Sequence, residues 1–170
     1  MKIFGILVII IATTAIGWEW ARRLRLRTKQ LKDVRVGLEA LETEMVYGLT
    51  PLSEACERVS RQVRNPVGQL FHRFAQDLQQ EEMLASEVWQ QTLIKMKNTI
   101  EFKQGEWDVL HQFGQTLGQQ DLENQRKHLR LALTYLEQQE ADAREHQRKH
   151  ESMYKSLGFL CGILIALIML

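Results

Sequence analysis

The amino-acid sequence predicts an all-α fold: a compact six-helix cytoplasmic bundle with one transmembrane helix at each end of the chain. Three observations predict this fold. The 170 residues include only 2 Pro and 10 Gly, too few for a sheet-rich fold with many turns. Apolar residues recur at helical spacing throughout the middle of the chain. Uncharged apolar runs lie at both ends, whereas the middle is rich in Gln, Glu, Arg and Leu.

The first predicted element is a transmembrane helix over residues 1–22. The run from Ile3 to Trp18 carries no charged residue, and a basic cluster follows it between Arg22 and Lys29. Because Lys and Arg beside a span hold their side in the cytoplasm, this cluster favours an uncleaved anchor over a secretory signal peptide. Trp18 and Trp20 lie where an interfacial aromatic belt belongs.

The last predicted element, residues 153–170, mirrors the first. Leu157 to Leu170 carries no charge, and Lys155 lies on its inner flank. The same rule then places both termini outside and residues 23–152 in the cytoplasm. Each apolar run is short for a hydrocarbon core of about 30 Å, so snorkelling of flanking Lys and Arg side chains is expected to make up the difference.

Small residues recur four apart in both predicted spans, as Thr13 with Gly17 and Gly158 with Gly162. Such faces let helix backbones approach closely in lipid, which predicts packing between the two spans. The alternative interpretation is that small residues are simply common in membrane spans.

The region 23–152 is predicted to form the bundle, with the solvated segment 144–151 leading out of it. Six amphipathic stripes predict its helices. The residues expected to face the core are Leu31, Val34, Leu38, Leu41 and Met45; Leu52, Ala55, Cys56 and Val59; Val67, Leu70, Phe71, Phe74 and Leu78; Val88, Trp89, Leu93 and Met96; Trp107, Leu110, Phe113, Gly114 and Leu117; and Leu122, Leu129, Ala132, Leu133 and Leu136.

The boundaries between these helices follow from caps and breakers. Thr50-Pro51 and Asn65-Pro66 predict helix starts, with the polar residue as N-cap and Pro at the first helical position. Further expectations are a helix end at Tyr47 to Leu49, a cap at Ser86, a loop from Asn98 to Phe102, a C′ residue at Gly118 and a cap at Asp121. Short connections predict antiparallel neighbours.

Catalytic, cofactor-binding and metal-binding residues are all predicted to be absent. The chain has no GxxxxGK[ST] loop for ATP and no GxGxxG after a strand. Its net charge of +1 gives no signature of nucleic-acid binding. Glu42 and Glu44 are two residues apart on a helix and so do not form a catalytic pair. Cys56 and Cys161 do not form a disulfide framework.

Two histidine arrangements each leave an alternative open. His146 and His150 are spaced i, i+4 and can present two imidazoles to one metal, but their neighbours are polar and the interpretation as a solvated helix is favoured. His128 is a candidate phosphoryl acceptor in a signalling relay, set against an ordinary surface or half-buried histidine.

Several segments together resemble the family of stage III sporulation protein AB. They are LETEMVYGLTPL at Leu41–Leu52, QFGQTLG at Gln112–Gly118, KHLRLAL at Lys127–Leu133, KSLGFL at Lys155–Leu160 and ATT at Ala12–Thr14. The resemblance covers essentially the whole chain. The residues that carry the family motifs are Glu44, Tyr47, Gly48, Thr50, Pro51, Leu52, Phe113, Gly114, Leu117, Gly118, Lys127 and His128.

The resemblance implies a non-enzymatic membrane platform component of endospore formation. Family members lie in the mother-cell membrane around the forespore, with the bundle toward the mother-cell cytoplasm, in the channel called a feeding tube. Their cytoplasmic domain is similar to the F-type platform protein of type II secretion and type IV pilus machines. The implied partners are the membrane, an AA-type hexameric ATPase and other stage III channel proteins, and a homo-oligomer is left open. Two alternatives remain: a membrane-tethered signalling relay through His128 and a passive coiled-coil scaffold.

Overall fold

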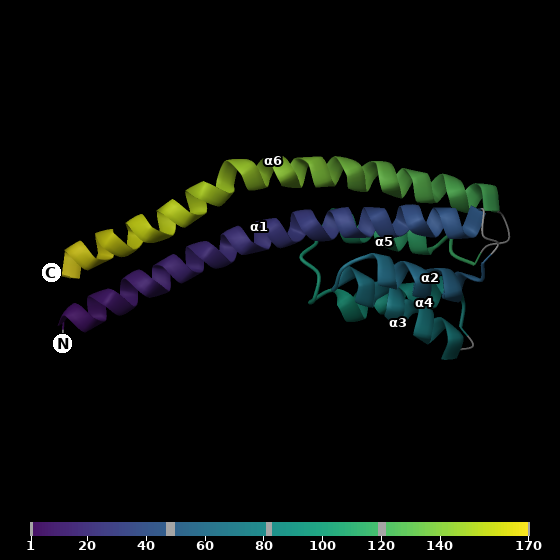
Figure 1. Cartoon of the computed structure of the whole chain (residues 1–170), viewed down its shortest axis with the longest axis horizontal. Coiled ribbons are helices and arrows are strands. Elements are labelled where there is room, and N and C mark those ends of the chain that lie inside the picture. The colour runs from purple at the N-terminus through teal and green to yellow at the C-terminus, as the bar shows by residue number, and fades with distance from the viewer. Residues whose placement is uncertain (1, 47–49, 81–82, 119–121, 170) are drawn as a thin grey trace. The chain divides into compact units, whose positions relative to one another are not determined.

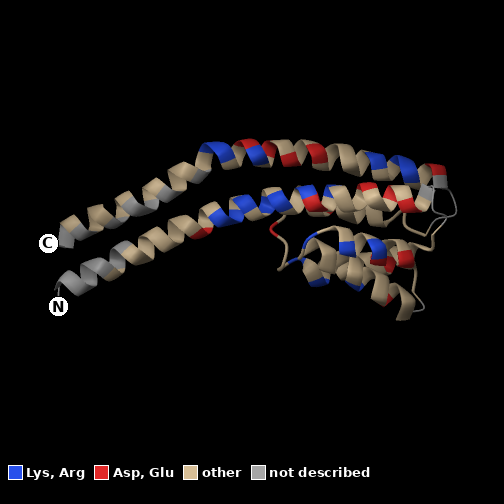
Figure 2. Ribbon diagram, viewed as in Figure 1, with Lys and Arg blue, Asp and Glu red and all other residues tan. Residues whose placement is uncertain are grey.

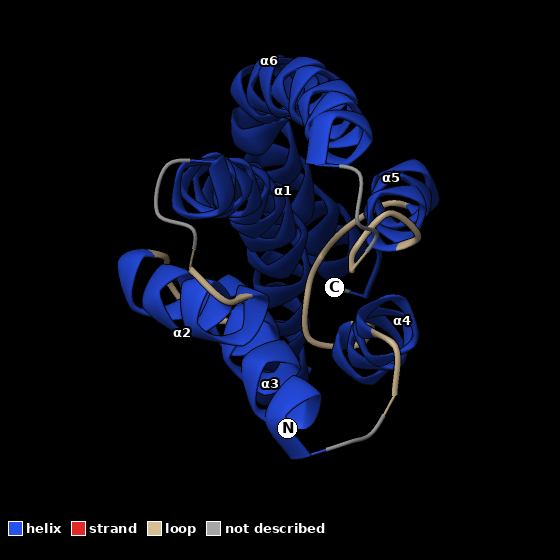
Figure 3. Ribbon diagram, turned by 90° about the vertical axis from the view of Figure 1, so that its right-hand side faces the viewer, coloured by secondary structure: helices blue, strands red, loops and turns tan. Residues whose placement is uncertain are grey.

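The computed structural model describes residues 2–46, 50–80, 83–118 and 122–169, and every regular element in that part is a helix (Figures 1 and 3). The helices are α1 (Lys2–Val46), α2 (Leu52–Gln62), α3 (Val67–Gln80), α4 (Ala85–Met96), α5 (Gln104–Gly114) and α6 (Leu122–Met169). The all-α part of the predicted fold class is therefore confirmed.

The predicted transmembrane helix at each end of the chain is wrong. Among the described residues, no helix combines the length and the apolar character that a membrane crossing requires. The reason lies in the length of the uncharged runs. Ile3 to Trp18 ends against Glu19, and the second run begins only after Lys155. Both are shorter than the roughly 20 apolar residues that cross a hydrocarbon core.

The chain divides into two compact units. The bundle unit comprises residues 29–140, and the end unit comprises residues 1–28 with 141–170. α1 and α6 each contribute residues to both units, whereas α2 to α5 belong to the bundle unit alone. The predicted boundaries at residues 22–23 and 152–153 stay predictions.

In the bundle unit, α1 and α6 lie side by side and antiparallel. Glu42, near the end of α1, contacts Arg126 and Arg130 at the start of α6, whereas the earlier Arg35 contacts the later Glu140. The shorter helices follow one another in space, with α2 on α3, α3 on α4 and α4 on α5. Buried apolar side chains from all six helices close one core.

An aromatic cluster lies at the centre of that core. Trp89 makes edge contacts with Phe74, at 5.0 Å between ring centroids, and with Phe113, at 5.7 Å. Phe71 lies 6.1 Å away on the same indole. The indole Nε1 donates a hydrogen bond of 2.9 Å to the carbonyl of Leu110, so the one polar atom of this side chain is satisfied.

Gly114 makes the close packing of this cluster possible. A Cβ atom at this position would overlap the ring of Trp89. A similar approach occurs where α1 meets α3, because a Cβ on Gly37 would lie 2.6 Å from Cε2 of Phe71. At both positions the missing Cβ leaves room for the aromatic ring beside the helix.

Most predicted helix boundaries shift by one or two residues. α1 ends at Val46, directly before the predicted breaker, and residues 97–103 lie between helices as expected. Pro51, rather than Thr50, is the N-cap of α2, and the Thr50 hydroxyl donates a hydrogen bond to Glu44. Leu84, rather than Ser86, is the N-cap of α4. Gly118 has φ +79°, the conformation expected of a C′ residue, but α5 already ends at Gly114.

The end unit joins the beginning of α1 to the end of α6. Trp20 and Tyr154 pack with 5.7 Å between their ring centroids. Away from this contact, many large apolar side chains are exposed: Val8, Ile11, Ile16, Trp18, Met153, Leu157, Leu160, Ile163, Leu164, Ile165 and Leu167. Gly17 is buried and Thr13 is half-buried. The surroundings of Gly158 and Gly162 lie outside the described part, so their packing stays a prediction.

Candidate interaction surface

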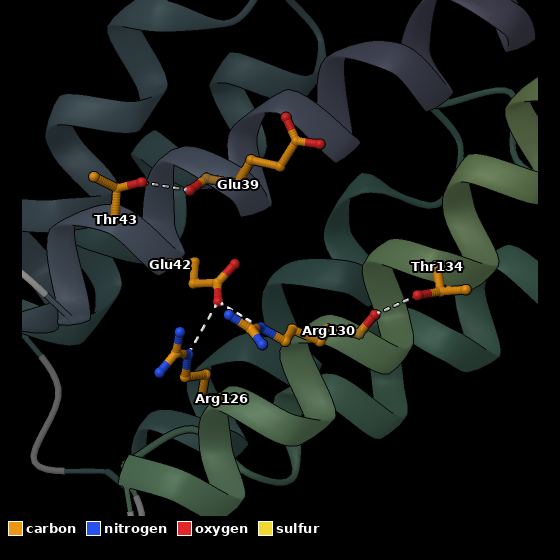
Figure 4. A network of polar contacts seen from close by, with 6 residues as sticks. All are labelled: Glu39, Glu42, Thr43, Arg126, Arg130 and Thr134. Carbon is orange, nitrogen blue, oxygen red and sulfur yellow. Dashed lines mark hydrogen bonds and ion pairs between the residues drawn. The ribbon is translucent and has the colours of Figure 1, made fainter.

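The best-defined polar network of the bundle unit joins α1 to α6 (Figure 4). The Nε atoms of Arg126 and Arg130 both donate to the same oxygen of Glu42, over 3.4 Å and 3.0 Å. Leu129, Ala132 and Leu136 of α6 are buried. Arg126, Arg130 and Thr134 are four residues apart, so helical spacing places them in a separate row beside that buried stripe.

A second ion pair secures the same two helices further along. Nε of Arg35 lies 3.0 Å from Oε2 of Glu140, a carboxylate whose side chain is almost fully buried. Burial lowers the pKa of Arg35, but the hydrogen bond to Glu140 and the nearby charge of Glu39 raise it more, so the pKa lies above its ordinary value. The guanidinium side of this ion pair therefore stays charged throughout the accessible pH range.

Beside the Glu42 network lies a groove along α6, which we call the α6 groove. Its volume is about 620 Å³, and its lining residues are Glu123, Asn124, Arg126, Lys127, Arg130, Leu131 and Thr134. Leu131 is exposed for 57% of its surface. Figure 2 shows basic residues close together at this end of α6. The groove thus combines cationic groups with one apolar contact.

The motif residues around Leu41–Leu52 join α1 to α2. Oε2 of Glu44 accepts hydrogen bonds from the Thr50 hydroxyl, over 3.1 Å, and from Nη1 of Arg58, over 3.2 Å. Pro51 caps α2, and Leu52 is its half-buried first residue. Tyr47 and Gly48 lie outside the described residues. Glu42 and Glu44 therefore have separate partners.

The motif residues around Gln112–Gly118 belong to the core. Phe113 packs its ring against Trp89, Gly114 leaves room for the same ring, and Leu117 is buried. Gly118 supplies the positive φ that ends the turn after α5. Phe113, Gly114 and Leu117 are buried and stabilise the bundle, whereas Gly118 is exposed.

The remaining motif residues lie on α6. Lys127 is exposed in the α6 groove, and among the described residues it has no ion-pair partner. His128 is half-buried beside it. The signalling relay through His128 stays a prediction.

The histidine pair in the end unit is stacked. The rings of His146 and His150 are 5.1 Å apart at an interplanar angle of 21°, and Nδ1 of His150 lies 3.1 Å from the carbonyl of His146. Within the described residues, no group of three or more His, Cys, Asp or Glu is arranged to hold a metal ion. In the bundle unit, burial raises the pKa of the Cys56 thiol far above its usual range, which makes the thiol unreactive.

The Glu42 network is the feature that the sequence analysis did not find. Arg126 and Arg130 carry a visible signal, because two basic residues at i, i+4 form one row on a helix. Their partner lies 84 and 88 residues away on α1. Only the antiparallel pairing of α1 with α6 would have pointed to it.

The comparisons with known proteins agree with one another. Residues 2–170 match the family model described as stage III sporulation protein AB. The chain is 42% identical over 170 residues to stage III sporulation protein AB of Bacillus subtilis (strain 168), covering 100% of this chain and 99% of that protein. A solved structure of stage III sporulation protein AB has a TM-score of 0.70 and 41% identity, covering 73% of this chain and 98% of that one. The chain belongs to the stage III sporulation protein AB family.

Proposed function

We propose that this chain is a non-enzymatic membrane platform component of the mother cell–forespore channel, or feeding tube, and that it anchors or couples a cytoplasmic secretion-type ATPase. The observation that carries the proposal is the presence of two units with different surfaces. The bundle unit has a closed core and a charged outer face, whereas the described part of the end unit exposes large apolar side chains.

The bundle unit supports the docking part of the proposal. Two of its carboxylates secure one helix to another: Glu42 joins α1 to α6, and Glu44 joins α1 to α2. Its motif residues around Phe113 are taken up by the core. A rigid helical body with a patterned charged surface is suited to holding a protein partner, and the resemblance to F-type platform proteins makes a hexameric ATPase the expected one.

The end unit supports the location. Exposed Trp18 and Trp20, with Arg22 and Arg23 close by, combine aromatic and basic side chains in the manner of protein surfaces that contact anionic membranes. We therefore place the end unit at the mother-cell membrane that surrounds the forespore and the bundle unit toward the mother-cell cytoplasm.

The test is co-purification from sporulating cells. A tagged full-length chain should retain the AA-type ATPase, and a variant with polar replacements of the exposed apolar residues Trp18 and Leu164 should retain it equally while leaving the membrane fraction. If the ATPase is absent from the tagged complex in every nucleotide state, the docking function is wrong. If the polar variant stays in the membrane fraction, the assignment of the end unit is wrong.

A further inference from the structure

We propose that the α6 groove is the docking site for an acidic segment of the protein that the bundle unit binds, a segment with at least two carboxylates beside an apolar side chain. The inference rests on the proposed function, because it assigns the surface that receives the partner. It goes further by stating the chemistry of the contact.

A shared carboxylate holds the two arginines beside the α6 groove in place. Glu42 binds Arg126 and Arg130 through their Nε atoms, and among the described residues these two arginines form no other ion pair. A guanidinium offers five N–H donors, so the terminal amino groups of both side chains stay available. One carboxylate thereby orients two guanidiniums before any partner arrives. Preorganised arginines lose less conformational entropy when they bind carboxylates in a bidentate manner.

The charge of the α6 groove also favours an acidic partner. Arg126, Lys127 and Arg130 line the α6 groove together with the single acidic residue Glu123. Glu42 is shared between two arginines, and Lys127 has no ion-pair partner within the described chain. The groove therefore keeps an excess of positive charge on a protein whose net charge is only +1. This local excess is complementary to an acidic segment and steers its approach.

An acidic protein segment fits the α6 groove better than a nucleic acid does. Leu131 exposes an apolar side chain within the groove, where a protein segment can place an apolar side chain of its own. A phosphate backbone has no apolar side chain to place against Leu131. The surface fits alternating acidic and apolar side chains.

The experiment compares variants of the full-length chain in two binding measurements. The groove variant carries Lys127→Glu with Arg130→Glu. A second variant carries Lys127→Glu alone, which disturbs no ion pair among the described residues and so preserves the fold. The matched control carries Arg73→Glu with Lys97→Glu, two exposed residues on α3 and after α4, and has the same change in net charge. Circular dichroism verifies that each variant is folded.

The two probes are the purified AA-type ATPase and a fluorescent peptide of Glu-Glu-Leu repeats. The groove variant should bind both at least roughly tenfold more weakly than the control, and Lys127→Glu alone should lose roughly threefold. Raising the salt concentration should narrow these differences. Equal binding of the ATPase by the groove variant, by Lys127→Glu and by the control overturns the docking site while the proposed function stands.

The remaining outcomes separate the two proposals. If the unaltered chain does not bind the ATPase but binds the peptide through the groove, the ATPase is the wrong partner and the acidic chemistry of the site is supported. If the unaltered chain binds neither probe, both proposals are overturned.

Discussion

The bundle unit and the end unit use the same two long helices but treat their large apolar side chains in opposite ways. In the bundle unit, Trp89, Phe74 and Phe113 are buried against one another. In the described part of the end unit, Trp18 is 62% exposed and Leu167 is 71% exposed. The bundle unit thus gains its apolar stabilisation internally, whereas the end unit would gain more from contact with an apolar surface outside the chain.

The polar contacts show the same contrast. The bundle unit joins distant segments through ion pairs such as Arg35 with the buried Glu140. The end unit has pairs within single helices, such as Glu145 with Lys149, in which both side chains are mostly exposed. Since exposed pairs contribute little and partly buried pairs are costly to break, we expect the bundle unit to depend more strongly on its individual contacts.

The largest expected difference concerns tryptophan. Trp89→Ala removes the centre of the aromatic cluster and should lower the free energy of unfolding by about 3–5 kcal/mol. Trp18→Ala, at an exposed position of the end unit, should change it by no more than about 0.5 kcal/mol. Chemical denaturation followed by far-ultraviolet circular dichroism measures both. Equal losses would show that the two units do not differ in this way.

A smaller difference is expected between two glycines of α5. Gly114→Ala places a methyl group against the ring of Trp89 and should cost about 1–3 kcal/mol. Gly105→Ala meets only the hydroxyl end of Tyr135, a flexible side chain that can move aside, and should be neutral or stabilising by up to roughly 0.5–1 kcal/mol. Thermal melting of the two variants gives the comparison. If Gly114→Ala is as stable as Gly105→Ala, the aromatic cluster around Trp89 is less tightly packed than the structure shows.

The ion pairs give the next prediction. Glu140→Gln weakens the partner of Arg35 in a largely buried place and should cost about 1–2 kcal/mol. Glu145→Gln, in the exposed pair of the end unit, should cost at most about 0.5 kcal/mol. Both are measured by urea denaturation at low and at high salt. A larger loss of stability for Glu145→Gln than for Glu140→Gln would contradict the expected difference between the two units.

The smallest effect is a dependence on pH. The hydrogen bond from His72, with the contact to Arg61, holds the pKa of Glu57 below its ordinary value of 4.5. A carboxylate with a lowered pKa stabilises the fold above its unfolded-state pKa, and this contribution is lost as the pH falls through the folded-state value. Glu57→Gln should therefore reduce the loss of stability below pH 4.5 and leave the slope above pH 6 little changed. An unchanged acid limb would contradict this assignment.

The core of the bundle unit could be predicted from the sequence because burial follows helical periodicity. The apolar stripes predict that certain side chains face the core, and the structure buries them, as it does Leu31, Leu38, Phe74, Leu110 and Leu136. Periodicity needs only local information, since the spacing of apolar residues on one helix decides which face is covered.

The features that could not be predicted depend on distant or competing partners. The pairing of Glu42 with Arg130 joins residues 88 positions apart, which no local pattern reveals. Pro51 takes the N-cap position predicted for Thr50, whose hydroxyl donates a hydrogen bond to Glu44, a residue of α1. The uncharged ends of the chain predict two spans, but absence of charge does not replace the length that a membrane crossing requires.

The contrast between the two units requires that residues 29–140 form a unit with a core of their own. Thermal unfolding of a fragment with these residues, followed by circular dichroism, tests it. We expect a highly helical fragment that unfolds in a single cooperative transition, because the aromatic cluster and the Glu42 and Glu140 ion pairs all lie inside it. A fragment with little helix, or one that unfolds gradually without a transition, would contradict the central claim.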